Sequence, residues 1–266
     1  MILPWVALLA LLDAAPAAAP RCALELPATI RQGELVVAHA APECRVRIDG
    51  RELRSTRDGR FVFGVGRDAG RVVVEAGGER VERAVQRRDY RIERVDGVPP
   101  STVTPSPELA ARIAREQALV AQARRRDDER ADFLESFLPP LEGRVSGVYG
   151  SMRVLNGVPR DPHYGHDIAA PTGSAVRAPA SGVVTLAERD FHLTGGTVLL
   201  DHGHGVSSVF LHLSRIDVSA GQRVARGEVF GAVGATGRAS GPHLHWGLNW
   251  FDVRLDPALV LERAAR

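Results

Sequence analysis

The chain has 266 residues, enough for one large domain or two modest ones. Its net charge of +2 gives no indication of a nucleic-acid partner, and 44% hydrophobic with 25% charged residues is ordinary for a globular protein. All 34 basic residues are arginine, so functions that require a lysine are excluded.

The first residues are typical of an export signal. An apolar run from Ile2 to Leu12 is followed by small residues up to Ala19, where a signal peptidase could cut. The run is too short for a membrane-spanning helix. We therefore expect a signal peptide at residues 1–19, no membrane span, and a periplasmic or secreted protein. No basic residue precedes the run and Pro20 follows Ala19, so cleavage a few residues earlier is the alternative.

The two cysteines, Cys22 and Cys44, both lie near the N-terminus. An even number of cysteines in an exported chain favours a disulfide bond that closes a short loop. Two unrelated buried thiols are the alternative.

Residues 20–95 show the pattern of a small β-sandwich. Val46 and Ile48 alternate with arginines. One further short apolar run follows the turn at Asp58-Gly59, and another precedes the turn at Gly77-Gly78. His39 stands alone in this part of the chain, and we interpret it as structural. We expect this module to be a spacer, a lid or a binding unit.

Residues 96–140 are predicted to form a linker and one helix. The linker is rich in proline, Ser106 is a good N-cap, and Pro107 fits the first helical position. We expect the helix to end at Pro139-Pro140. The charged residues 124–130 are interpreted as a solvated helical face and not as a nucleic-acid site.

From residue 141 to residue 266 the pattern is again β. Short apolar runs such as Gly182–Leu186, Thr197–Asp201 and Ser207–His212 are separated mostly by glycine-rich turns, and no long helical period occurs. We therefore expect an antiparallel β domain of two packed sheets. The overall fold class is mainly β, with a sandwich, a connecting helix and this larger domain.

Eight of the nine histidines follow Pro162, which places the chemistry in the larger domain. His163 and Asp167 are four residues apart, close enough for a turn to direct both at one ion. His243 and His245 project from the same face of an extended stretch, so one can bind the ion while the other lies beside it. Two histidines and one carboxylate form a catalytic zinc site, with one position left for water.

A zinc ion would lower the pKa of its bound water to about 7. The remaining imidazoles could then remove a proton and stabilise the tetrahedral intermediate of attack on a carbonyl group. His212 ends a β-rich stretch and could approach the ion from a neighbouring strand.

Four other histidines are given structural interpretations. His166 could compete as a ligand, but we interpret it as a partly exposed turn residue. His202 and His204 are interpreted as part of a polar β-turn. His192 is interpreted as a turn residue or one at the rim of a groove.

These segments resemble the LytM/lysostaphin-type peptidases, the M23 zinc metallopeptidases. The resemblance covers about Gly143 to Pro257 and rests on three motifs in order: His163-x-x-x-Asp167, Phe210-Leu211-His212-Leu213-Ser214, and Thr236 to His245. It implies that His163, Asp167 and His245 bind one zinc ion and that His212 and His243 are catalytic. It also implies peptidoglycan peptides as substrates. Phe210 departs from the family, in which many members carry tyrosine.

The expected function is that of a zinc endopeptidase that cuts peptide cross-links or stems of peptidoglycan. We expect the extended peptide substrate to bind in a groove near Asn156, Phe191 and Gly237. Family members without ligands regulate cell-wall amidases, but every expected ligand is present here. A zinc DD-carboxypeptidase remains an alternative. Residues 220–234 resemble a lipoyl or biotinyl carrier hairpin, which the absence of lysine excludes.

Overall fold

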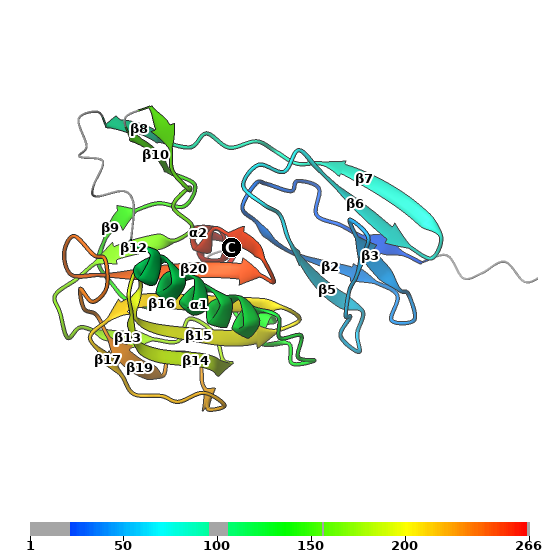
Figure 1. Ribbon diagram of the computed structural model, residues 1–266. Helices are drawn as coiled ribbons and strands as arrows, with labels where there is room; N and C mark the ends of the chain where they lie inside the picture. The colour runs from blue at the N-terminus through cyan, green and yellow to red at the C-terminus, as the bar shows by residue number, and fades with distance from the viewer. Residues whose placement is uncertain (1–21, 96–105, 156, 265–266) are drawn as a thin grey trace, which may run out of the picture.

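The computed structural model describes residues 22–95, 106–155 and 157–264, and these consist mainly of β-strands (Figure 1). A small β-module at the N-terminal end is followed by one long helix and a larger antiparallel β domain, so the predicted fold class is confirmed. The predicted signal peptide, residues 1–19, and most of the predicted linker lie outside the described residues.

The N-terminal module consists of two antiparallel sheets that share one buried core. One sheet has the order β1-β2-β5 and the other the order β4-β3-β6-β7. The strands are β1 (Leu24–Glu25), β2 (Leu35–Ala40), β3 (Val46–Ile48), β4 (Arg51–Glu52), β5 (Arg60–Gly64), β6 (Arg71–Ala76) and β7 (Glu79–Ala84). Phe61 from one sheet and Val74 from the other are fully buried, whereas β3 alternates, with Val46 and Ile48 buried and Arg47 exposed.

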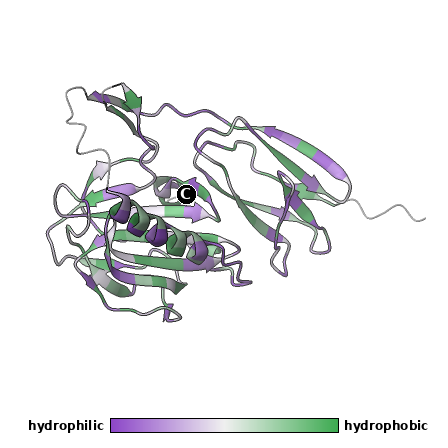
Figure 2. Cartoon of the chain, in the orientation of Figure 1, coloured by the Kyte–Doolittle hydropathy of each residue, from purple (hydrophilic) through white to green (hydrophobic). Residues whose placement is uncertain are grey.

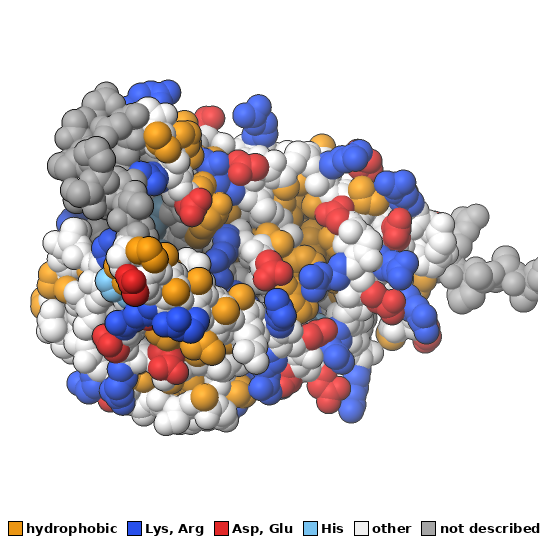
Figure 3. Space-filling model, in the orientation of Figure 1, with side chains coloured by type: hydrophobic (Ala, Val, Ile, Leu, Met, Phe, Trp, Pro, Cys, Tyr) orange, Lys and Arg blue, Asp and Glu red, His pale blue; other side chains and the backbone are white. Residues whose placement is uncertain are grey.

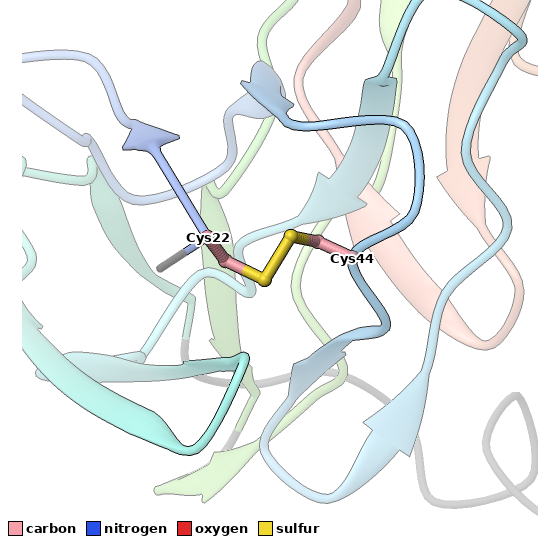
Figure 4. The surroundings of a disulfide bond; sticks show 2 residues. All are labelled: Cys22 and Cys44. Carbon is pink, nitrogen blue, oxygen red and sulfur yellow. A yellow bond between two sulfur atoms is a disulfide. The ribbon is translucent and has the colours of Figure 1, made fainter. Parts of the chain in front are cut away.

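Cys22 and Cys44 form the predicted disulfide bond, with their Cα atoms 5.8 Å apart (Figure 4). Cys22 precedes β1 and Cys44 precedes β3, so the bond ties together the first strands of the two sheets. Its role is therefore to hold the sandwich closed at one end.

A short sheet joins the end of the module to the larger domain. β8 (Ile92–Val95) pairs in parallel with β10 (Met152–Leu155), and β10 pairs antiparallel with β11 (Val158–Pro159). The chain before the long helix and the chain after it are thus hydrogen-bonded to each other here.

The long helix, α1 (Pro107–Arg124), begins where the sequence predicts. The Ser106 hydroxyl accepts a hydrogen bond from the N–H of Leu109 at 3.3 Å, and Pro107 occupies the first turn. Val120 packs against a buried cluster of the larger domain that contains Leu199, so α1 lies across one face of that domain's sheet. Stretches of α1 are purple in Figure 2, the colour of hydrophilic residues.

The predicted helix end at Pro139-Pro140 is wrong, because α1 ends at Arg124. The helical part of the interpretation of residues 124–130 is also wrong, since they are not helical beyond the first residue and the Arg124 side chain is buried, but Arg125, Arg126, Asp127 and Glu129 are exposed as expected. The segment is held instead by contacts with distant parts of the chain.

Those contacts centre on a 3₁₀ turn, η2 (Asp132–Leu134). Phe133 is fully buried in the core of the larger domain. Asp132 accepts hydrogen bonds from both terminal nitrogens of Arg223, at 2.5 and 2.7 Å, and a further one from Arg130. If α1 continued as a helix through these residues, Asp132 would not reach Arg223 and Phe133 would not reach the core.

The larger domain is built on an eight-stranded sheet with the order β18-β14-β15-β16-β20-β12-β9, and β21 pairs with β20. The strands are β9 (Arg144–Gly147), β12 (His166–Ala169), β14 (Gly182–Phe191), β15 (Gly195–Gly203), β16 (Val206–Leu213), β18 (Arg223–Val224), β20 (His243–Trp250) and β21 (Val253–Leu255).

The two faces of this sheet differ in what covers them. Trp246 of β20 and its partner Phe210 of β16 are fully buried in the main core. Their neighbours His245 and Leu211 pair on the opposite face, where Leu211 packs into the cluster under α1. The helix therefore covers part of the same face that carries His245.

A small second sheet with the order β13-β19-β17 forms another layer of this core. It contains β13 (Ala175–Arg177), β17 (Arg215–Ile216) and β19 (Val229–Ala232). The Phe230 ring lies 4.7 Å from the Phe210 ring, measured between centroids, so the two sheets pack on each other as expected.

A second helix, α2 (Pro257–Ala264), was not predicted. The Asp256-Pro257 pair is the sequence feature that could have predicted the start of this helix. Asp256 Oδ1 accepts a hydrogen bond from the N–H of Ala258 at 2.9 Å and so caps the N-terminus of α2. Leu259 and Val260 are buried against the domain.

The module packs against the end of the larger domain near β20 and β21. Gly64 of β5 lies so close to Trp250 that a Cβ atom on it would be 2.7 Å from the tryptophan Cβ. The Arg88 guanidinium forms an ion pair with Asp256 at 2.6 Å.

Acidic and basic side chains are interspersed over the face seen in Figure 3. Within the described residues, neither α1 nor α2 has the length and apolar character needed to cross a bilayer.

Candidate metal centre

Strand register places Asp167 directly opposite His245. The two residues are Cα partners in the antiparallel pair of β12 and β20, and His245 Nδ1 lies 2.8 Å from Asp167 Oδ1. Gly147 of β9 pairs with Asp167 from the other side, where a Cβ atom would come within 2.3 Å of the carboxylate. Glycine at this position lets the carboxylate fit between the strands.

His163 approaches the same point from the loop that precedes β12. Its Nε2 atom lies 3.0 Å from Asp167 Oδ1 and 3.1 Å from His245 Nδ1. Its Nδ1 atom lies 3.0 Å from the carbonyl oxygen of Val148. Because a carbonyl oxygen only accepts, Nδ1 carries the proton and the Nε2 lone pair points at the carboxylate.

The three side chains fit a divalent metal ion. Each offers one ligand atom, and these atoms lie within 4.8 Å of one another. A neutral imidazole lone pair that faces a carboxylate oxygen at hydrogen-bond distance requires a cation or a proton between them. Two imidazoles and one carboxylate are a ligand set of catalytic zinc, and the Val148 carbonyl supplies the outer hydrogen bond that orients such a histidine.

Electrostatics keep these groups in their metal-binding forms. Burial opposes ionisation of Asp167, but the two imidazoles beside it outweigh that effect and hold its pKa below the ordinary value. Burial lowers the pKa of His245, so its ring is neutral near pH 7. A neutral imidazole and an ionised carboxylate are the forms that bind metal.

His212 and His243 form a second pair next to the three candidate ligands. Their ring centroids lie 4.8 Å apart, and His243 precedes the ligand candidate His245 by two residues on the same face of β20. His212 follows Leu211, the cross-strand partner of His245. All five predicted site residues are thus brought to one end of the sheet.

Both rings of this pair are oriented by backbone carbonyls. His212 Nδ1 donates to the Thr236 carbonyl, and His243 Nδ1 donates to the Gly241 carbonyl, each at 2.8 Å. Each Nε2 atom is therefore left as a proton acceptor in the neutral ring. Burial lowers the pKa of His212 to about 4, so this ring is neutral near pH 7. His212 also adopts a positive φ of 64°, a conformation that non-glycine residues rarely take and that often occurs at functional sites.

His166 and His192 lie outside the cluster of three candidate ligands. The prediction of a turn at His166 is wrong: it belongs to β12, next to Asp167, so its side chain projects from the opposite face. The turn at His192 is confirmed, between β14 and β15, where its N–H donates to Glu116 of α1 at 2.8 Å.

The polar turn predicted for His202 and His204 is confirmed only for His204, which has a positive φ of 49°. His202 lies in β15 and is fully buried. Its Nδ1 donates to the Ser181 carbonyl at 2.7 Å, and its Nε2 accepts from the Ser208 hydroxyl at 2.9 Å. The strand can bury this imidazole because both nitrogens have partners.

The groove hypothesis receives little support from its named residues. Asn156 is outside the described residues, and Phe191 is buried in the cluster beneath α1. Gly237 packs against the turn that follows β14. The carbonyl acceptors at Val148 and Thr236 could not be predicted from the sequence, because a backbone carbonyl has no residue-type signature.

Comparison with known proteins assigns the family. The profile of Peptidase family M23 matches residues 161–257, which contain all five predicted site residues. A crystal structure from Pseudomonas aeruginosa, assigned to peptidase M23, is 32% identical, with a TM-score of 0.66. The similarity covers 87% of this chain and 94% of that one, so it includes the N-terminal module. The chain belongs to peptidase family M23.

Curated relatives of this M23 protein match over a shorter region. The peptidoglycan DD-endopeptidase ShyA of Vibrio cholerae is 44% identical over 87 residues, which are 33% of this chain and 20% of the relative. The DD-carboxypeptidase/endopeptidase Mpg of Neisseria meningitidis is 46% identical over 84 residues, 32% of this chain and 19% of the relative. The matches thus span about a fifth of these relatives' length. Membership of the family implies a metal centre.

Proposed function

We propose that this M23 protein is a zinc-dependent endopeptidase that hydrolyses amide bonds in the peptide cross-links or stems of peptidoglycan. One observation carries the proposal: the donor atoms of His163, Asp167 and His245 converge on one point beside two further imidazoles held as proton acceptors. The peptidoglycan substrate is inferred from relatives such as the ShyA endopeptidase.

In this proposal His163, Asp167 and His245 hold one zinc ion. Zinc, when bound, supplies a Lewis acid that polarises the scissile carbonyl and lowers the pKa of water to about 7. The chain's contribution is to fix the three ligands, by strand register for two of them and by a backbone carbonyl for the third.

His212 and His243 carry the proton transfers. Each has its Nδ1–H engaged by a carbonyl and presents an unprotonated Nε2, so one ring accepts the proton of the attacking water. That ring, now protonated, then passes this proton to the leaving amine, while the other ring, protonated on Nε2 from solvent, stabilises the negative oxygen of the tetrahedral intermediate. We assign these roles to the pair and do not divide them between the two residues.

The proposed location is the periplasm or the outside of the cell. A disulfide bond persists in such oxidising compartments, and peptidoglycan lies there.

Digestion of purified peptidoglycan sacculi tests the proposal. The full-length chain and a His245→Ala variant are incubated with sacculi, and the released muropeptides are identified by mass spectrometry. Conversion of cross-linked dimers to monomers by the wild type alone is the expected result. Zinc bound without any product would indicate an autoinhibited enzyme, whereas no zinc and no product would argue for a regulatory role.

A DD-carboxypeptidase activity is the second candidate, favoured by the name of the Neisseria relative. The same digestion separates the two activities. Release of terminal D-alanine from monomeric stem peptides, with cross-links intact, would replace the endopeptidase proposal.

A further inference from the structure

The three candidate ligands do not depend on the same parts of the fold. Asp167 and His245 lie on paired strands in the interior of the eight-stranded sheet, so the sheet alone fixes their positions. His163 lies between β11 and β12 and belongs to neither strand. Its position must come from the contacts of the loop that carries it.

Residues 148–151 provide those contacts. The His163 carbonyl accepts from the N–H of Gly150 at 2.8 Å, and the His163 N–H donates to the Ser151 carbonyl at 2.7 Å. Together with the bond from the ring Nδ1 to Val148, three hydrogen bonds hold the backbone and the ring of this residue. Any shift of residues 148–151 therefore moves the His163 Nε2 atom.

Residues 148–151 are in turn held by the N-terminal module. Arg67 follows β5 and donates from Nε to the Gly150 carbonyl at 3.0 Å. Its side chain is only 13% exposed, and its guanidinium carbon lies 4.2 Å above the centre of the Tyr90 ring. This is the geometry of a cation–π contact, which fixes the plane of the guanidinium.

Tyr90 completes the contact from the other side. Gly150 has a φ of +81°, and a Cβ atom on it would lie 2.1 Å from the Tyr90 ring. Two features therefore require glycine at position 150: the positive φ of its backbone and the close approach of the Tyr90 ring. Two residues after Gly150, the N–H of Met152 donates to the Arg91 carbonyl at 2.9 Å and continues the connection.

A row of aromatic rings runs along the same path. The Tyr90 ring lies 6.1 Å from the Tyr149 ring, and the Tyr149 ring lies 6.1 Å from the Tyr164 ring. Tyr149 is buried, and its hydroxyl donates to the Arg254 carbonyl at 2.9 Å. Tyr164 directly follows His163, so the row ends at the candidate ligand.

We propose that Arg67 is a positioning residue for His163, so that the N-terminal module completes the metal centre of the larger domain. The path runs from Arg67 through Gly150 to the backbone of His163, with each step a hydrogen bond. The inference rests on the proposed zinc site. It requires that loss of Arg67 weakens the His163 contribution to metal binding and leaves those of Asp167 and His245 unchanged.

Another arginine of the module offers a matched control. Arg31 forms an ion pair with Glu262 of α2 at 3.1 Å and thus also joins the module to the larger domain. Among the described residues, its ion-pair partners are Glu34 and Glu262 rather than residues 148–151, and both its side chain and that of Glu262 are partly exposed. Arg31→Ala removes a contact between the two parts without touching the loop that holds His163.

The experiment measures zinc affinity of the metal-free full-length protein by titration against a competing chelator. Arg67→Ala should bind zinc about tenfold more weakly, the range seen when outer contacts of metal ligands are lost. Arg31→Ala should stay within about twofold, as expected for an exposed ion pair. Arg67→Lys keeps one donor but loses the planar stacking on Tyr90, and should lie between the wild type and Arg67→Ala.

A double-variant cycle separates positioning from general destabilisation. In a His163→Ala background, Arg67→Ala should have no further effect on zinc affinity, because the residue through which it acts is gone. Equal affinity of Arg67→Ala and the wild type would overturn the inference, as would an undiminished effect in the His163→Ala background. If Arg67→Ala does not fold, the same comparison uses Arg67→Lys. A wild type that binds no zinc would instead overturn the proposed function.

Discussion

His243 and His245 lie two residues apart on one face of β20, yet their Nδ1 atoms have different partners. His245 Nδ1 faces the Asp167 carboxylate, whereas His243 Nδ1 is engaged by the Gly241 carbonyl. These partners support the roles proposed above, in which the first histidine holds a metal ion and the second exchanges protons. Residues of the same type at adjacent positions of one strand face thus receive distinct roles from their neighbours.

Replacement of these two histidines tests this division. His245→Ala should lose both bound zinc and activity, because it removes one of three ligands. His243→Ala should keep most of its zinc while activity falls by at least about 100-fold, the lower range for loss of a general acid or base. Zinc content by elemental analysis and muropeptide release check the two variants. Equal loss of zinc in both would contradict the division.

His202 makes stability depend on pH from a site outside the metal centre. Burial lowers the pKa of His202 to about 4 from its ordinary value of 6.5. The unfolded chain therefore binds a proton that the folded chain does not, so stability is complete above pH 6.5 and falls as the pH drops toward 4. Between about pH 7 and about pH 5 this group alone should cost about 2 kcal/mol.

Urea unfolding of the wild type and of His202→Gln at these two pH values measures the effect. The variant is expected to be less stable at neutral pH, since its hydrogen bonds to Ser181 and Ser208 are altered, but to lose about 2 kcal/mol less on acidification. Parallel losses in the two proteins would show that other groups carry the pH dependence.

Among the elements, η2 and the segment before it depend on one acidic residue. Asp132 is bonded by Arg223 from β18 and by Arg130 from its own segment, and its side chain is 11% exposed. Asp132→Asn leaves the two guanidinium groups without their carboxylate. We expect a loss of about 2 kcal/mol, below the roughly 3–5 kcal/mol of a fully buried pair, because Arg223 is half exposed.

Chemical denaturation of Asp132→Asn checks this expectation, with Asp127→Asn as the control. Asp127 lies in the same segment, but within the described residues its ion pair is with Arg54, at 3.3 Å, and both side chains are about 40% exposed. The control should change stability by less than about 1 kcal/mol. Similar losses in the two variants would contradict a special role for Asp132.

The elements also show which structural features are readable in the sequence. The strands and the start of α1 follow from local signals: alternation, glycine turns, and the Ser106 cap. The end of α1 does not, because it depends on the pairing of Asp132 with Arg223, 91 residues away. His202 was misassigned for a related reason, since its burial in a strand depends on two partners outside its local sequence, Ser181 and Ser208, which lie 21 and 6 residues away.

The candidate site divides in the same way. Histidines and a carboxylate at close spacing indicated the donors, because side-chain type carries that information. The groups that aim those donors are carbonyls, such as that of Val148, and an arginine that lies almost a hundred positions upstream of His163. No pattern of residue types near the ligands points to them.

At the scale of the whole molecule, the module that reaches His163 is itself closed by the bond between Cys22 and Cys44. The residues are 22 apart in the sequence, and a cross-link over a loop of this length stabilises a fold by about 3 kcal/mol. The double variant Cys22→Ala, Cys44→Ala should lose stability by about this amount. Urea unfolding measured with and without reductant checks the effect: the wild type should respond to reductant and the double variant should not.

The row of Tyr90, Tyr149 and Tyr164 contains every tyrosine of the chain. A fluorine atom introduced on tyrosine rings would therefore report from the contact between module and metal centre and from nowhere else in the molecule. Three ¹⁹F resonances could be followed during addition of zinc or peptidoglycan fragments, without a single substitution in the sequence. The composition of the chain thus allows the contact between the module and the candidate ligand His163 to be followed by spectroscopy.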